Sequence, residues 1–311
     1  MPKAENPKKA VQKRVKELSV VAKKSTIIKE EYYEQHDCKR GLRDINGKGV
    51  LVGLTEISEI IASKTDDQGN RIPCHGELYY RGILLDDIVR GFVQEKRFGF
   101  EETTYLLLFG KLPNEKELKE FSEMLATLRV LPSGFLRDVI MKRPSVDMMN
   151  VLQRSVLTLY AYDDIPDDIG IDNVLLQCLD LIAKFPMLSV YGYHVFKHYY
   201  EDGSLIIHKP DPTMSLAESF LHMLRADGNY TALEAKLLDL CMVLHAEHGG
   251  GNNSTFTDHV VTSSGTDTYS AIAASLGSLK GPRHGGANVK VIRMMQNIKE
   301  NVNINNDDSI R

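Results

Sequence analysis

The chain has 311 residues, of which 42% are hydrophobic and 26% are charged, and its formal net charge is −4. This composition is that of a folded protein with an ordinary buried core, in one large domain or two smaller ones. The slightly acidic balance gives no support for a main role in binding nucleic acid or acidic membranes. The one basic segment, residues 1–18, alternates lysines with apolar residues; no apolar signal core follows it, so we interpret it as a solvated leading helix.

The cysteines are scattered along the chain without paired spacing, at Cys38, Cys74, Cys178 and Cys241. This spacing argues against a zinc framework and against a disulfide framework, and it favours reduced thiols in a cytoplasm. No run approaches the roughly 20 consecutive apolar residues that cross a bilayer. We therefore expect a cytoplasmic protein that has no membrane partner.

Strand signals are few and lie in the first third of the chain. The segments "GVLVGLTEIS" (49–58) and "GELYYRG" (76–82) are short, rich in β-branched or aromatic residues and bounded by glycine. They predict a small hairpin or ribbon. The polar segment "SKTDDQGNRIPCHGE" (63–77) is expected to be a surface loop.

Helical periodicity dominates the rest of the sequence. Apolar stripes at helical spacing occur in residues 114–128, 146–162, 173–203, 215–225 and 231–248. Asn114 is positioned as the N-cap of the first of these helices, and Thr231 with Glu234 forms a capping box at the start of the last. Pro186 interrupts the third segment, which is expected to form one or two buried helices. The sequence therefore predicts a mainly α-helical protein with a small N-terminal β element.

Two histidines stand in "LHAEHGGGNNSTF" (244–256), at the end of an apolar helix. His245 and His248 have the spacing of neighbours on one helical face. A metal site, a pair of packing histidines and half of a catalytic apparatus are all consistent with this pattern. A closed metal site needs further ligands, but Glu247 points elsewhere on the helix, His259 is distant, and no HExxH motif is present.

A third histidine lies in "SLKGPRHGGANVKVIRMM" (278–295). Pro282 ends one helix and "ANVKVIRMM" begins another, which places His284 in a Gly281–Gly286 turn. Glycines at a helix entrance allow a ligand to approach the backbone and leave N–H groups free to face it. A neutral histidine in such a place can polarise a carbonyl oxygen, and two of them suit a reaction in which two carbonyl oxygens are polarised.

The two stretches "HAEHGGGNNST" and "SLKGPRHGGAN" together resemble the paired signature of the citrate synthase family. Four further segments occur in the family's order: "GELYYRGILLDDIV", "EETTYLLLFGKLPNEKELKEF", "RPSVDMMNVLQRSVLTLYAYDDIPDD" and "LAESFLHML". The resemblance runs from about Gly49 to about Asn301. It implies a citrate-synthase-like large helical domain over residues 49–311, after an N-terminal helical or extended arm over residues 1–48. It also implies a homodimer that forms through helices of the large domain.

The activity implied by the resemblance is a Claisen condensation of acetyl-CoA with oxaloacetate to citrate and CoA, a step of the tricarboxylic acid cycle, with acetyl-CoA as a substrate and neither cofactor nor metal. His248 matches the histidine that binds the thioester carbonyl and stabilises the enol. His284 matches the one that polarises the oxaloacetate carbonyl and later assists hydrolysis of citryl-CoA. Arg293 lies where an arginine reaches a substrate carboxylate, although a helix-surface arginine explains it equally well. The residues that match the CoA loop are Gly281, Pro282, Gly285, Gly286 and Asn288. The small polar residues Asn252 and Ser254 also match positions beside the first histidine, without an expected substrate contact.

The sequence departs from the family's pattern after His284. The family's general base is an aspartate in a "GxGHxxY/L…DPR" motif, and nothing in the final segment matches it. Asp307 and Asp308 stand in a polar tail and are not assigned this role. We therefore expect the closing small domain to be missing and turnover by this chain to be slow.

Three alternatives stay open. One is a 2-methylcitrate synthase, which uses propionyl-CoA. The second is a catalytically inactive homologue that acts as an interaction or regulatory subunit. The third is a histidine-based metallohydrolase, which the number of available ligands disfavours.

Overall fold

The structure is a computed structural model, and it describes residues 15, 18–20, 29–36, 39, 41–43, 49–50 and 54–302. Contacts divide the chain into two units, Met1–Leu51 and Val52–Arg311, which are treated separately. The elements described in the first are helix α2 (Glu30–Gln35) and a bridge between Arg43 and Gly49. The helix predicted over residues 1–18 lies outside the described residues except for Val15 and Leu18, and so does the polar tail.

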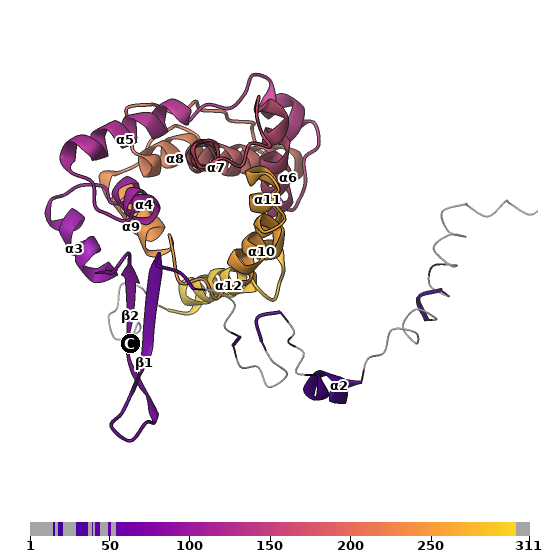
Figure 1. Cartoon of the computed structure of the whole chain (residues 1–311). Coiled ribbons are helices and arrows are strands. Elements are labelled where there is room, and N and C mark those ends of the chain that lie inside the picture. The colour runs from indigo at the N-terminus through magenta and orange to yellow at the C-terminus, as the bar shows by residue number, and fades with distance from the viewer. Residues whose placement is uncertain are drawn as a thin grey trace, which may run out of the picture. The chain divides into compact units, whose positions relative to one another are not determined.

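The second unit is mainly α-helical, as predicted, with one small antiparallel sheet (Figure 1). Its strands are β1 (Ser58–Thr65), β2 (Arg71–Tyr80) and β3 (Ile83–Leu84). Its α-helices are α3 (Leu85–Gln94), α4 (Phe100–Phe109), α5 (Glu115–Leu128), α6 (Met148–Leu159), α7 (Ile171–Tyr200), α8 (Leu216–Leu224), α9 (Ala232–Leu244), α10 (Asn253–Thr262), α11 (Thr268–Lys280) and α12 (Gly286–Asn301). A short π-helix (Leu136–Met141) and a 3-10 helix (Tyr160–Tyr162) flank α6.

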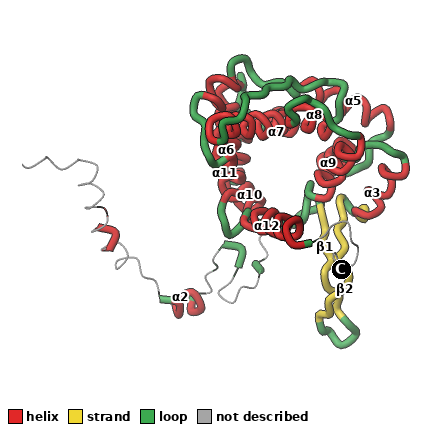
Figure 2. Tube along the Cα trace, turned by 180° about the vertical axis from the view of Figure 1, so that it is seen from behind, coloured by secondary structure: helices red, strands yellow, loops and turns green. Residues whose placement is uncertain are grey.

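The predicted hairpin exists, but its first strand begins later than expected. The strand predicted over 76–82 is the end of β2, whereas residues 54–57 are not in a strand. The segment 63–77, expected to be a loop, forms much of the hairpin instead. Residues 59–75 gave no strand signal because the ribbon projects from the helices (Figure 2) and faces solvent on both sides: even Ile60 and Ile72 are about half exposed.

A tight turn closes this ribbon. The Oδ1 atom of Asp66 accepts hydrogen bonds from the backbone N–H groups of Gln68 (3.0 Å) and Asn70 (2.7 Å). Gly69 has a φ of +83°, which a glycine adopts without steric cost. These polar residues therefore form the turn of a hairpin and not a long loop.

The predicted helix starts are confirmed. Asn114 caps α5 in a reciprocal capping box with Glu117. Thr231 and Glu234 form the same motif at α9. Each cap satisfies backbone N–H groups that have no partner inside the helix.

The predicted interruption at Pro186 is wrong, because α7 continues through this residue. A proline inside a helix removes one backbone hydrogen bond. Pro186 is buried, however, and α7 packs against α5, α6, α8 and α11, so tertiary contacts offset the loss. Against expectation, α7 is also long and apolar enough to cross a membrane by length and composition, with 50% of its most apolar window buried inside the structure. These are equally the properties of a core helix.

Three apolar clusters form the core of the second unit. The largest joins α6, α7, α8 and α11, a second joins β2, α3, α4 and α9, and a third joins α5 and α7. The helices that lead to His248 and His284, α9 and α11, each have buried residues in one of these clusters. Both histidine loops therefore start from a packed helix.

Candidate active site

His248 lies in the loop that follows α9. The helix ends at Leu244 with His245 as its C-cap, so the prediction that His245 and His248 share a helical face is wrong. Three glycines follow His248 in the loop, and Gly249 has a φ of +93°, a backbone conformation that favours glycine. The Nδ1 atom of His245 lies 2.7 Å from the carbonyl oxygen of Cys241 in its own helix, whereas the side chain of His248 is exposed.

The Tyr80 hydroxyl fastens this loop to the sheet. Tyr80 is the last residue of β2 and is fully buried. Its hydroxyl lies 3.0 Å from the carbonyl oxygen of Val243 and 2.9 Å from that of Glu247, and it accepts a hydrogen bond from the Glu247 N–H at 3.2 Å. One side chain thus holds the end of α9 and the residue that precedes His248.

The Glu247 carboxylate supports the loop from its other side. Its Oε1 atom accepts hydrogen bonds from the Ser58 hydroxyl (3.0 Å) and from the Gly249 N–H (2.5 Å). A Cβ atom on Gly249 would lie 3.1 Å from Ile60 Cδ1 of β1. The Glu247 carboxylate therefore ties the loop to the base of the ribbon and also holds the backbone just after His248.

Helices α10 and α11 bring the second histidine loop to the same place. The Ser254 hydroxyl donates to the carbonyl oxygen of Ser275 (3.2 Å), and the Ser275 hydroxyl donates to that of Ser254 (3.1 Å). The Ser278 hydroxyl donates to Asn253 Oδ1 (2.6 Å). The start of α10 therefore lies against the end of α11. The loop before α10, which carries His248, and the loop after α11, which carries His284, lie at the same end of this helix pair.

His284 is half-buried and bonded to Ser254. The distance from Ser254 Oγ to His284 Nε2 is 2.8 Å. A hydroxyl has one proton, and the carbonyl oxygen of Ser275 can only accept, so Ser254 donates to Ser275 and accepts from His284. This assigns a proton to Nε2 of His284.

The turn around His284 requires glycine at one position. The N–H groups of His284 and Gly285 donate to the carbonyl oxygen of Gly281 at 3.0 and 2.8 Å. A Cβ atom on Gly285 would lie 2.1 Å from the carbonyl oxygen of Leu279, whereas one on Gly286 would meet nothing within 4 Å. Gly285 is therefore needed for the close return of the chain after α11.

The remaining predicted site residues lie in or beyond this turn. Pro282 is in the turn, Gly286 begins α12, and Asn288 is in the first turn of that helix. Arg293 lies further along α12 with an exposed side chain, and α12 has no buried residue. Their predicted roles with CoA and with a substrate carboxylate stay predictions.

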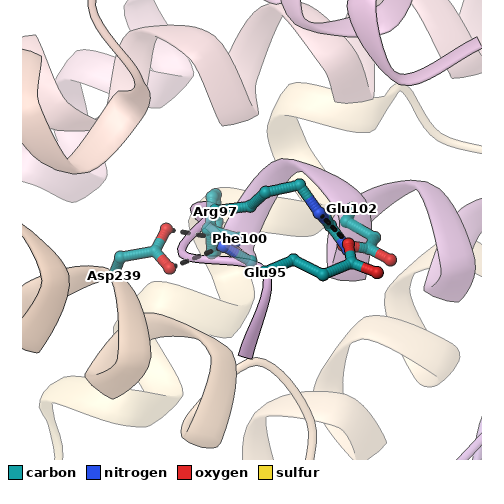
Figure 3. A network of polar contacts seen from close by, with 6 residues as sticks. Glu95, Arg97, Phe100, Glu102 and Asp239 are labelled. Carbon is teal, nitrogen blue, oxygen red and sulfur yellow. Dashed lines mark hydrogen bonds and ion pairs between the residues drawn. The ribbon is translucent and has the colours of Figure 1, made fainter. Parts of the chain in front are cut away.

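The α9 helix has a second anchor, a buried carboxylate. The Asp239 carboxylate, 1% exposed, accepts hydrogen bonds from the N–H groups of Gly99 (2.7 Å) and Phe100 (3.1 Å) at the start of α4. Figure 3 shows it facing this backbone, with Arg97 paired to Glu95 and Glu102 nearby. Burial raises the pKa of Asp239 to about 6, although the two hydrogen bonds oppose the shift.

Within the part of the chain that the structure describes, no group of three or more His, Cys, Asp or Glu side chains could hold a metal ion. The cysteines described there, Cys74, Cys178 and Cys241, are free thiols. The prediction that no metal takes part stays a prediction.

Comparison with known families decides the chain's membership. The family profile described as "Citrate synthase, C-terminal domain" matches residues 42–309. The chain belongs to the citrate synthase family. The match covers both histidine loops, so the sequence resemblance and the family assignment rest on the same part of the chain.

Curated relatives within the citrate synthase family carry two names. The citrate synthase of Haloferax volcanii is 34% identical over 269 residues, which are 85% of this chain and 63% of that protein. The 2-methylcitrate synthase 1 of Corynebacterium glutamicum is 31% identical over 256 residues, 81% of this chain and 61% of that protein. The citrate synthase of Synechocystis is 34% identical over 72% of this chain and 53% of its own length. The chain thus spans between about half and two thirds of these relatives.

Solved citrate synthases share the fold. The enzyme from Pyrobaculum aerophilum superposes with a TM-score of 0.64 at 28% identity, over 82% of this chain and 61% of that one. The citrate synthase from Thermoplasma acidophilum, solved in a ternary complex with carboxymethyl coenzyme A and oxaloacetate, gives 0.65 at 26% identity over 80% and 59%. The predicted citrate-synthase-like helical fold is confirmed.

Proposed function

We propose that this citrate synthase family member binds an acyl-CoA thioester and oxaloacetate through its two histidine loops and acts in their condensation. The observation that carries the proposal is the pairing of α10 with α11 through Ser254 and Ser275. It puts the loops of His248 and His284 at one end of a helix pair, where two substrates can lie side by side. Reactive groups held in this way gain much of the advantage of an intramolecular reaction.

In this proposal, each of the two histidines donates a hydrogen bond to a carbonyl oxygen of a substrate. The Nε2 proton of His284, which Ser254 accepts here, is the donor that would meet the ketone oxygen of oxaloacetate. His248, exposed in its loop, would donate to the thioester oxygen and stabilise the enol. The turn at Gly281–Gly286 would hold the CoA end.

In the proposed reaction, a base removes a proton from the carbon next to the thioester carbonyl. That carbon forms a bond to the ketone carbon of oxaloacetate, whose oxygen takes up a proton to become a hydroxyl. Water then cleaves the thioester, which gives the new carboxylate and the free CoA thiol. The base in the family is an aspartate whose motif has no match in this sequence.

The acyl group, the assembly and the compartment belong to the proposal as well. Acetyl-CoA is the expected substrate, and the similarity to 2-methylcitrate synthases supports propionyl-CoA as the alternative. We also propose a homodimer in the cytoplasm, without a metal, a membrane or nucleic acid as partner.

The test is thiol release from acetyl-CoA and from propionyl-CoA, each with and without oxaloacetate. We expect thiol release that depends on oxaloacetate, is lost in H248A and H284A, and persists in H245A. His245 is the matched control because its side chain bonds to its own helix. Release that is independent of oxaloacetate, or unchanged in both H248A and H284A, contradicts the proposal.

A further inference from the structure

The Ser254 hydroxyl joins α10 to α11 and to the loop of His284. Ser254 lies in the first turn of α10, whose N-cap Asn252 accepts a hydrogen bond from the Thr255 N–H at 2.9 Å. The hydroxyl oxygen lies 2.8 Å from Nε2 of His284 and 3.2 Å from the carbonyl oxygen of Ser275. All three of these residues are half-buried. The contacts of this hydroxyl are therefore partly shielded from competing water.

The backbone at Ser254 is held from α11. The Ser275 hydroxyl donates to the carbonyl oxygen of Ser254 at 3.1 Å, and the Ser278 hydroxyl donates to the side chain of the preceding residue, Asn253, at 2.6 Å. With its backbone fixed in this way, the Ser254 hydroxyl leaves His284 only by rotation about χ1. That rotation would also break its bond to the Ser275 carbonyl oxygen.

The two contacts of the Ser254 hydroxyl define what it can do chemically. The carbonyl oxygen of Ser275 only accepts, so it takes the hydroxyl proton, and the hydroxyl oxygen is left to accept the Nε2 proton of His284. A backbone carbonyl is not a base at neutral pH, so it cannot draw the proton away from Ser254. The hydroxyl therefore orients a proton on His284 and does not remove it.

The other ring nitrogen of His284 has no comparable contact. Among the described residues, the Ser254 hydroxyl is the one group that bonds to this imidazole, and it does so at Nε2. In a neutral imidazole one nitrogen carries the proton and the other accepts, and the hydrogen bond made by the ring decides which tautomer forms. Ser254 is thus the residue that distinguishes the two nitrogens of His284.

We propose that Ser254 is a positioning residue of the histidine site, which keeps neutral His284 in the Nε2–H tautomer before oxaloacetate binds. The inference rests on the proposed function, in which Nε2 of His284 donates to the ketone oxygen. That oxygen replaces the Ser254 oxygen as the acceptor, and no proton has to move from Nδ1 to Nε2. A donor that is already in place polarises the carbonyl without reorganisation during the reaction.

Nitrogen-15 NMR of the full chain tests this inference, because protonated and unprotonated ring nitrogens have different chemical shifts. The spectra are recorded at about pH 8, where an ordinary imidazole is neutral, and the His284 signals are identified by their loss in H284A. We expect the Nε2–H tautomer in the parent. S254A removes the acceptor and should lower the ratio of Nε2–H to Nδ1–H by about two- to twelvefold, the effect of one hydrogen bond.

Two matched variants separate the hydroxyl from general effects of substitution. S254T keeps a hydroxyl at the same position, and S275A keeps the carbonyl oxygen to which Ser254 donates, so both should show the parent's tautomer.

Addition of oxaloacetate gives a second readout. In the parent we expect the Nε2 signal to shift as its acceptor changes, while Nδ1 stays unprotonated. An unchanged tautomer ratio in S254A, a parent that is mainly Nδ1–H, or protonation of Nδ1 when oxaloacetate binds would overturn the inference. A parent that does not bind oxaloacetate would contradict the proposed function instead, and the comparison of S254A with the parent would still decide whether Ser254 sets the tautomer.

Discussion

Removal of the Tyr80 hydroxyl should loosen the loop that carries His248. In Y80F the ring still fills its buried place in β2, but the carbonyl oxygen and N–H of Glu247 each lose a partner. The carbonyl oxygen of Val243 keeps a hydrogen bond from the Ala246 N–H. An unsatisfied buried group costs about 1–3 kcal/mol, and Glu247 is only half-buried, so we expect a total loss in this same range.

Urea unfolding measures the global part of this loss, and hydrogen exchange measures the local part. Y79F is the matched control, because among the described residues the neighbouring Tyr79 hydroxyl bonds only to the Glu77 side chain (2.7 Å). We expect Y79F to lose less than about 1 kcal/mol and Y80F to exchange faster at residues 245–251. Equal stability and equal exchange in the two variants would refute the idea that Tyr80 holds this loop.

Three further outcomes are expected. Urea unfolding of G285A should show a loss of at least about 2 kcal/mol in the free energy of unfolding, because its Cβ atom would lie 2.1 Å from the Leu279 carbonyl oxygen. G286A should behave as the parent does, since a Cβ atom there meets nothing within 4 Å. Equal stability of the two variants counts against the geometry of the turn. Burial raises the pKa of Asp239 to about 6, above its unfolded value of about 4, so the folded chain binds this proton more tightly than the unfolded chain does. The contribution of Asp239 to stability therefore falls as the pH rises from about 4 to about 6. The parent should lose at most about 3 kcal/mol relative to D239N over this interval, and parallel pH profiles would contradict this. Light scattering at micromolar concentration should show a homodimer, and a soluble monomer would contradict that prediction.

The helices were predictable where local chemistry defines them. Asn114 and Thr231 indicate where α5 and α9 begin, because capping side chains bond to backbone groups only a few residues away. The interruption predicted at Pro186 was wrong for the opposite reason. Packing on four neighbouring helices keeps α7 continuous, and the local sequence carries no signal of that packing. The position of the ribbon was predicted wrongly because strands that face solvent on both sides lack the alternation of apolar and polar residues that marks a half-buried strand.

The candidate site was predictable as motifs, but its supporting contacts were not. The glycines around His248 and His284 are visible in the sequence, and Gly249 and Gly285 have structural reasons to be glycine. The hydroxyl of Tyr80 acts across 163 to 167 residues of chain, a separation at which local patterns carry no signal. Ser254 was noted beside the first histidine, yet its bond is to the second. A polar residue in the first turn of α10 was the only available clue.

The claim that the two histidine loops form one substrate site is tested most directly by calorimetric titration of oxaloacetate. The parent chain should bind it, and H284A should weaken binding by about 1–3 kcal/mol through loss of one hydrogen bond to a carbonyl oxygen. H245A should bind as the parent does. An H284A variant with unchanged affinity, or a parent chain that does not bind oxaloacetate, would contradict this account.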